Sequence, residues 1–232
     1  MGRFHRHDDG TVHTHDHAEH PHEHHDQGDH SGYETGSQRI DVLESIFAEN
    51  DVRADYNRKA FESNGVRALN LMSSPGSGKT TVLGATLDEL AGEFAVGVIE
   101  GDIATDLDAP MVNRALQGLD LARLDLVIIE NVGNLVCPAE FDVGEHAKAM
   151  VYSVTEGDDK PLKYPVMFRA VDVVLLNKID LVPYLDVDVD CYTARVREVN
   201  PTATILPISA RTGAGMSAWF GWLRRFMAAA AT

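Results

Sequence analysis

Hydrophobic and polar residues follow two kinds of pattern between about residue 66 and the C-terminus. Six short runs are almost continuously apolar, and stretches with helical spacing separate several of them. A strand inside a parallel sheet is covered on both faces, so its sequence is apolar throughout rather than alternating. The runs expected to form strands are residues 66–72, 94–100, 124–130, 149–154, 171–176 and 203–209.

Five other stretches carry apolar residues at helical spacing. The first covers residues 39–64 and ends at Asn64-Gly65, where glycine favours a helix stop. The remaining four cover residues 80–91, 111–119, 191–199 and a C-terminal stretch through Trp219 and Trp222. Strands alternating with helices predict an α/β fold, with a mostly parallel sheet and helices on both faces. Ligands in such folds bind at the carboxyl ends of the strands.

A glycine-rich run, SSPGSGKTT, follows the first predicted strand and opens the second predicted helix. Glycines let successive backbone N–H groups approach a phosphate, and the helix N-terminus adds partial positive charge. The run matches a P-loop, except that Ser73 stands where the general pattern has its first glycine. A strand-to-helix turn without a ligand is the alternative, but the Lys-Thr pair and the flanking elements favour phosphate. The candidate nucleotide-binding residues here are Gly76, Ser77, Gly78, Lys79, Thr80 and Thr81.

Within this run, two side chains carry distinct chemistry. Lys79 is expected to contact the β- and γ-phosphates as a mobile point charge. The hydroxyl of Thr80 is placed to ligate Mg²⁺. A P-loop NTPase is therefore the expected fold class.

A second motif, NKID, follows the apolar run 171–176. The carboxylate of Asp180 can accept hydrogen bonds from guanine N1–H and its exocyclic amine, which adenine does not match. Lys178 can lay its aliphatic stem along the base, and Asn177 completes the motif. Ser209 and Ala210 begin SARTG after the last predicted strand, where a backbone N–H can meet guanine O6. An ordinary strand-end turn is the alternative, but the order of the matches predicts a GTPase.

Two acidic residues also follow predicted strands. Asp102 is the candidate for the Mg²⁺ shell, directly or through water. Glu130 closes the strand 124–130 and could orient water or metal, and Gly133 could offer its N–H to the γ-phosphate. Lys79, Asp102 and Glu130 are the candidate catalytic residues. Helix capping and loop solvation are the alternative explanations for Asp102 and Glu130. The nearby P-loop favours the catalytic interpretation over these alternatives.

The first 38 residues form a separate region, expected to be a disordered His-rich tail. Ten of the eleven histidines lie in residues 1–30 among acidic residues, and apolar residues are rare there. Imidazoles on a flexible chain suit Ni²⁺, Zn²⁺ and Cu²⁺. An expression tag and a solvating tail are the alternatives, and the irregular acidic spacing favours metal binding. The candidate nickel ligands are His13, His15, His17, His20, His22, His24 and His25.

Composition agrees with a cytoplasmic protein having one GTPase domain at residues 39–232. The chain has 232 residues, of which 44% are hydrophobic, and a formal net charge of −16. That charge argues against nucleic acid as a partner. No apolar stretch is long enough for a membrane span, and two cysteines make no disulfide framework.

The stretch from Glu130 to Phe168, ENVGNLVCPAEFDVGEHAKAMVYSVTEGDDKPLKYPVMF, closely resembles the hydrogenase nickel-incorporation GTPases of the HypB family. The P-loop with serine at its first position is also similar to that family's. The resemblance covers residues from about 40 to the C-terminus. It implies GTP hydrolysis coupled to nickel delivery into the large subunit of a [NiFe]-hydrogenase. It also implies a nucleotide-dependent homodimer and a small nickel metallochaperone partner of the HypA type.

The sequence departs from this family between Asp102 and Leu124. Family members carry a longer insert there, with a Cys-His pair that forms a metal site together with the cysteine of NLVCP. Here Cys137 remains as a Ni²⁺ or Zn²⁺ ligand and the pair is missing. One thiolate cannot hold tetrahedral zinc alone. The shortened segment after Ala109 puts the coupling of GTP to metal in question. Two alternatives stay open: a nickel or zinc storage protein with an impaired nucleotide domain, and a urease-accessory GTPase.

Overall fold

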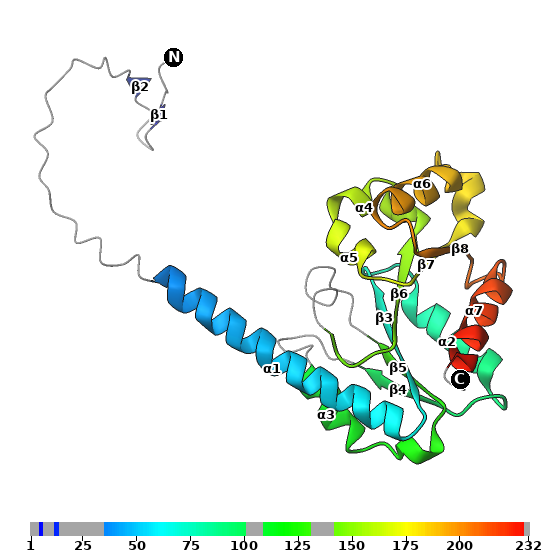
Figure 1. Cartoon of the computed structure of the whole chain (residues 1–232). Helices are drawn as coiled ribbons and strands as arrows, with labels where there is room; N and C mark the ends of the chain where they lie inside the picture. The colour runs from blue at the N-terminus through cyan, green and yellow to red at the C-terminus, as the bar shows by residue number, and fades with distance from the viewer. Residues whose placement is uncertain (1–4, 7–11, 14–34, 101–108, 131–141, 230–232) are drawn as a thin grey trace, which may run out of the picture. The chain divides into compact units, whose positions relative to one another are not determined.

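The computed structural model describes residues 5–6, 12–13, 35–100, 109–130 and 142–229, with side chains described from Ala48 onward (Figure 1). The chain divides into two compact units, residues 1–40 and 41–232. In the first unit, β1 (His5–Arg6) pairs antiparallel with β2 (Val12–His13), which the sequence did not predict. The expected disorder and metal binding of the tail otherwise fall outside the described residues and stay predictions.

The second unit is built on a six-stranded parallel sheet with strand order β4-β5-β3-β6-β7-β8. All six predicted strands are present. The strands are β3 (Arg67–Ser73), β4 (Val96–Glu100), β5 (Leu126–Glu130), β6 (Ala147–Ser153), β7 (Val173–Asn177) and β8 (Thr204–Pro207). β3 is central, with β5 on one side and β6 on the other, so the residues after these three strands meet at one edge of the sheet.

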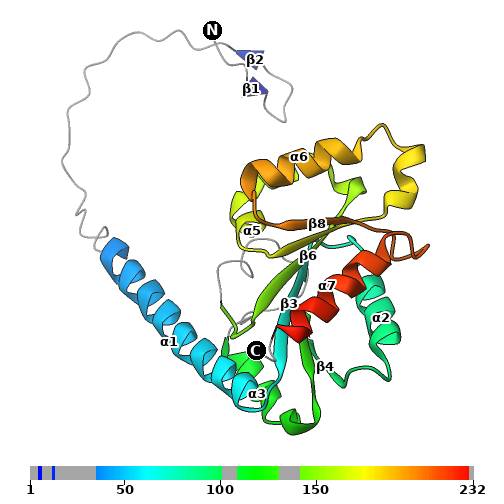
Figure 2. The ribbon, with the colours of Figure 1, turned by 45° about the vertical axis from the view of Figure 1, so that its right-hand side comes forward.

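Helices cover both faces of this sheet, as the apolar strands predict (Figure 2). One face carries α2 (Lys79–Leu90) and α7 (Met216–Ala228). The other carries α1 (Thr35–Ser63), α3 (Ala109–Leu116), α5 (Pro165–Arg169) and α6 (Val189–Val199). α4 (Lys160–Lys163) and the 3-10 helices η2 (Leu121–Arg123), η3 (Val154–Glu156) and η4 (Ile179–Tyr184) join these elements and were not predicted. None of the described helices is long and apolar enough to cross a membrane.

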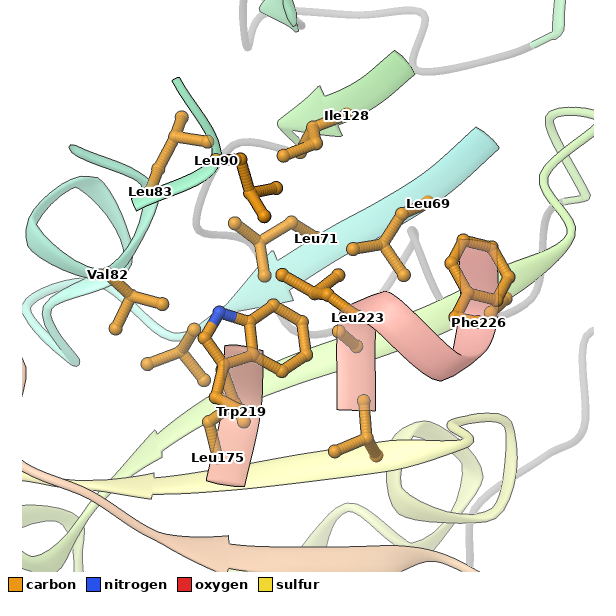
Figure 3. Packing of buried hydrophobic residues seen from close by; sticks show 14 of the residues in the cluster. Leu69, Leu71, Val82, Leu83, Leu90, Ile128, Leu175, Trp219, Leu223 and Phe226 are labelled. Atoms are coloured by element: carbon orange, nitrogen blue, oxygen red, sulfur yellow. The ribbon is translucent and has the colours of Figure 1, made fainter. Parts of the chain in front are cut away.

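Alternate residues of each strand belong to different cores. In β3, Leu69 and Leu71 pack with α2 and α7, whereas Ala68 and Met72 belong to the clusters on the opposite face. Figure 3 shows the first core, in which Trp219 of α7 lies among leucines and valines of β3 and α2. Its indole N–H also donates to the Thr86 hydroxyl of α2, at 2.9 Å. This contact satisfies the polar atom of a buried indole and joins α7 to the helix after the glycine-rich turn.

The face under α1 contains a buried polar contact. Asn57 is fully buried, and its amide donates to the carbonyls of Ala109, at 2.9 Å, and Val143, at 3.1 Å. Asn113 of α3 donates to the Asn57 oxygen, at 3.2 Å. A single buried amide of α1 therefore contacts the backbone at both Ala109 and Val143. α1 begins at Thr35, four residues before the expected boundary, so the division into domains at residue 38 remains a prediction.

Candidate nucleotide site

The loop between β3 and α2 forms a turn that only glycine adopts easily at two positions. Gly76 and Gly78 have φ values of 74° and 97°, and the Ser77 N–H donates to the Ser74 carbonyl at 3.3 Å. α2 begins at Lys79, so the N–H groups of its first turn point back towards this loop. The loop lines a cavity of about 420 Å³, together with Thr80, Thr81 and Lys178. The arrangement is a preformed cradle for an anion at a helix N-terminus.

Lys79 follows this loop as the first residue of α2, and its side chain is largely buried. Its Nζ is 3.4 Å from the Glu130 carboxylate at the end of β5, and both side chains are about nine-tenths buried. Burial lowers the pKa of Lys79, and the charge of Glu130 opposes that effect. The glutamate thus stabilises a lysine charge that the interior alone would disfavour.

Asn177 links the glycine-rich loop to the end of the sheet that carries NKID. Its amide donates to the Ser77 carbonyl at 2.9 Å, and its oxygen accepts from the Ala210 N–H at 3.1 Å. The fit is tight, because a Cβ added to Gly78 would lie 2.5 Å from the Asn177 amide nitrogen. Lys178 has a left-handed φ of 65°, and its ammonium donates to the Gly76 carbonyl at 2.6 Å.

Asp180 faces a second cavity of about 350 Å³, which shares Gly78, Thr81 and Lys178 with the first. One Asp180 oxygen accepts from the Ser209 hydroxyl at 2.7 Å, which orients the carboxylate. Arg211 was not among the predicted residues, and its Nε lies 3.8 Å from the other oxygen. It is 81% exposed, so this ion pair is weak. The two cavities are adjacent, with the phosphate cradle in one and the Asp180 carboxylate in the other.

Sequence reasoning also missed a contact on the β6 side of the loop. The Ser74 hydroxyl contacts the Glu156 carboxylate, and the ammonium of Lys160 lies 2.5 Å from the same hydroxyl. Glu156 and Lys160 also form an ion pair. Their i,i+4 spacing was visible in the sequence, but the position of the pair beside the loop was not.

Other predicted site residues fall outside the described part of the chain: Asp102, Gly133, Cys137, His15, His17, His20, His22, His24 and His25. His13 lies in β2, but its side chain is not described. His146 precedes β6 at the opposite edge of the sheet, where its Nδ1 accepts from the Ala68 N–H at 3.0 Å. Among the described residues there is no group of three or more His, Cys, Asp or Glu side chains that could hold a metal ion.

Cys191 is a partly buried free cysteine whose thiol donates to Asp158 at 3.0 Å. This hydrogen bond and burial raise the pKa of the thiol, which favours its protonated form. Since metals bind the thiolate, these contacts do not favour a metal-binding role for Cys191.

A phosphate loop after the central strand of a parallel sheet, whose cavity adjoins the cavity at the NKID motif, defines a P-loop GTPase. Residues 112–207 match the model of the CobW/HypB/UreG nucleotide-binding domain. The hydrogenase maturation factor HypB of Azotobacter chroococcum is 46% identical in an alignment of 212 residues, and the alignment covers 82% of this chain and 70% of the relative.

Two solved structures agree. HypB from Archaeoglobus fulgidus has a TM-score of 0.73 and 38% identity, over 77% of this chain and 99% of that chain. HypB from Helicobacter pylori in complex with nickel has a TM-score of 0.72 and 32% identity, over 77% of this chain and 95% of that chain. The chain belongs to the HypB family of hydrogenase maturation factors.

Proposed function

We propose that this protein hydrolyses GTP to GDP and phosphate, and that hydrolysis accompanies nickel insertion into the large subunit of a [NiFe]-hydrogenase during maturation. The observation that carries the proposal is the pair of adjacent cavities, one lined by the P-loop and the other by Asp180, which share Gly78, Thr81 and Lys178. This arrangement suits a ligand that has phosphates in one cavity and a base with paired donors in the other. The relatives named as hydrogenase maturation factors supply the biological context.

In this proposal the loop N–H groups and Lys79 bind the phosphates. Lys79 then leaves Glu130 for the β- and γ-oxygens, and the freed carboxylate can orient the attacking water. Thr80 fits as a Mg²⁺ ligand because it lines the phosphate cavity beside Lys79, and Asp102 is the second proposed ligand. Bound Mg²⁺ would neutralise phosphate charge. The Gly133 N–H is proposed to contact the γ-phosphate. Asn177, Lys178, Asp180, Ser209 and Ala210 hold the guanine.

Nickel is the proposed cargo, with zinc as a second metal that the same ligands accept. The tail of residues 1–30 has a formal charge of 2 − 7 = −5 from two Arg and seven Asp or Glu, with its ten His neutral. We expect it to hold several ions weakly, because the disorder predicted for the tail would have to be lost when it coordinates them. Cys137 is the proposed ligand in the GTPase domain, where two copies could contribute in a nucleotide-dependent homodimer. A nickel metallochaperone of the HypA type, the hydrogenase precursor and a cytoplasmic location complete the proposal.

One experiment separates the maturation GTPase from a metal-storage protein. Hydrogenase activity is measured in cells across a nickel titration, with Lys79→Ala and with residues 1–30 deleted. We expect Lys79→Ala to abolish maturation at every nickel concentration, because phosphoryl transfer depends on this charge. The tail deletion should reduce activity only when nickel is scarce. A phenotype of the tail deletion alone would favour storage instead.

Two controls sharpen this comparison. Arg123→Ala removes an exposed cation from η2, which precedes β5 at the edge of the sheet opposite the phosphate loop, and should leave maturation unchanged. A tail in which the ten histidines are replaced by glutamine keeps the length and the acidic residues. If it behaves like the deletion, imidazoles carry the effect rather than chain length. Nickel uptake by the intact tail should fall below about pH 6.5, where imidazoles become protonated.

A further inference from the structure

The glycine-rich loop is in contact with one acid–lysine ion pair on each of its two sides. β3 runs between β5 and β6, and each neighbour delivers a glutamate at its carboxyl end. Glu130, the last residue of β5, reaches Lys79 at the end of the loop. Glu156, three residues after β6, reaches Ser74 at the beginning of the loop. Both members of the first pair are predicted catalytic residues, and the second pair has no role in the reaction as described so far.

The second pair is well ordered by its hydrogen bonds. One Glu156 oxygen accepts from the Ser153 N–H at 2.9 Å, in a capping box with the Ser153 side chain. The other oxygen receives the Ser74 hydroxyl and the Lys160 ammonium. The side chains of Glu156 and Lys160 are each only 12% exposed. A carboxylate that is desolvated in this way is held firmly, because water does not readily replace a donor that is lost.

Ser74 connects the Glu156–Lys160 pair to the phosphate-binding loop. It is 5% exposed, and its carbonyl accepts the Ser77 N–H that closes the turn. The hydroxyl, fixed by the pair, therefore fixes the first residue of the loop whose N–H groups face the cavity. Donors that are already in place bind an anion without further loss of conformational freedom. A loosened Ser74 would leave the same N–H groups present but less well aimed.

We propose that Glu156 and Lys160 are positioning residues for the phosphate loop and act through the Ser74 hydroxyl. The inference rests on the proposed nucleotide-binding function of this site. It assigns the pair a role in holding the empty cradle ready for the phosphates of GDP and GTP. A role confined to capping η3 is the competing explanation, and it would not involve Ser74.

The first test compares Ser74→Thr with Ser74→Val. The two side chains have nearly the same shape, and only threonine keeps the hydroxyl. Affinities for fluorescent GDP and GTP analogues are read from titration midpoints, which a smaller folded fraction does not move. We expect Ser74→Val to bind both nucleotides about tenfold more weakly, the size of one hydrogen bond to a charged group, and Ser74→Thr to bind like wild type. Equal affinities for the two variants would overturn the proposal.

The second test removes the pair without changing net charge, by the double replacement Glu156→Gln with Lys160→Met. This variant should also weaken both nucleotides about tenfold, and adding Ser74→Val should cause no further loss, because all three residues act as one unit. A hundredfold loss in the combined variant would show independent effects and refute the coupling. Asp159→Asn is the matched control, since its carboxylate pairs with Lys163 in an exposed i,i+4 ion pair of the same segment.

Two further measurements keep the outcome clear. The preference for GTP over ATP should stay unchanged in every variant, because Asp180 lines the second cavity, to which Ser74 does not contribute. If the pair variant does not fold, the Thr and Val variants of Ser74 decide the question alone. Lys79→Ala separates this inference from the proposed function. Wild-type nucleotide binding by Lys79→Ala would mean that the proposed function fails. Loss with Lys79→Ala but none with Ser74→Val would mean that only the positioning role fails.

Discussion

Replacing Asp180 by asparagine should exchange the nucleotide preference of this protein. One oxygen of Asp180 is held by the Ser209 hydroxyl at 2.7 Å, and an asparagine oxygen can accept the same hydrogen bond. The amide NH₂ then takes the place of the second oxygen, which faces the cavity near Arg211. This position now offers donors instead of an acceptor. Guanine presents its own amine there, whereas xanthine presents a carbonyl.

The expected size of the change follows from the bonds that are lost. Guanine N1–H and the exocyclic amine each donate to the carboxylate, and a hydrogen bond to a charged group contributes about 1.5–3 kcal/mol. Asparagine keeps an acceptor for N1–H and loses the acceptor for the amine, which weakens GTP by about 1.5–3 kcal/mol, or roughly ten- to a hundredfold at about 1.4 kcal/mol for each factor of ten. Arg211 changes this little, because it is largely exposed and its ion pair with Asp180 is long.

Isothermal titration calorimetry with GTP, ATP and xanthosine triphosphate measures this effect. Wild type should prefer GTP over both, and Asp180→Asn should prefer the xanthine nucleotide. Asp186→Asn makes the same chemical change at an exposed carboxylate six residues further on, and should keep the wild-type order. Equal binding of GTP and ATP by wild type would refute the assignment of Asp180. An unchanged order in Asp180→Asn would show that the carboxylate does not contact the base.

Three other variants test residues that support the fold or the nucleotide site. Asn57→Ala should lower the free energy of unfolding by about 2–6 kcal/mol in chemical denaturation, because two buried carbonyls lose their donor; a loss below about 1 kcal/mol would contradict this. His146→Gln should flatten the fall in stability below about pH 6.5. Burial lowers the folded-state pKa of His146, so the unfolded chain binds the extra proton, and stability present above the unfolded pKa is lost on acidification. Gly78→Ala should abolish nucleotide binding in the same titrations, since its Cβ meets Asn177, whereas Gly84→Ala, with open space, should bind normally.

Much of the architecture could be predicted from sequence because its signals are local. Apolar runs bounded by polar residues predicted all six strands, and helical spacing located α1, α2, α3, α6 and α7 within a few residues. The short helices α4 and α5 were missed, because each is too brief to show a period. The P-loop and NKID were recognisable for a related reason. Each motif is a contiguous set of residues whose chemistry depends on its own backbone turn and on the strand before it.

Contacts between distant segments could not be predicted in the same way. The order of the strands places β6 beside β3, and only this pairing brings Glu156 to Ser74, 82 residues away in the chain. The contacts of Asn57 with Ala109 and Val143 likewise require α1 to pack against the face of the sheet formed by β4 and β5. These are the strands that precede the two residues.

A periodicity records whether a residue faces a core, but not which element completes that core. The sequence alone therefore determined the elements, the turn chemistry and the nucleotide motifs of this protein. The tertiary structure decided which buried acids and amides meet the phosphate loop, because those partners are selected by packing across the sheet rather than by neighbours along the chain.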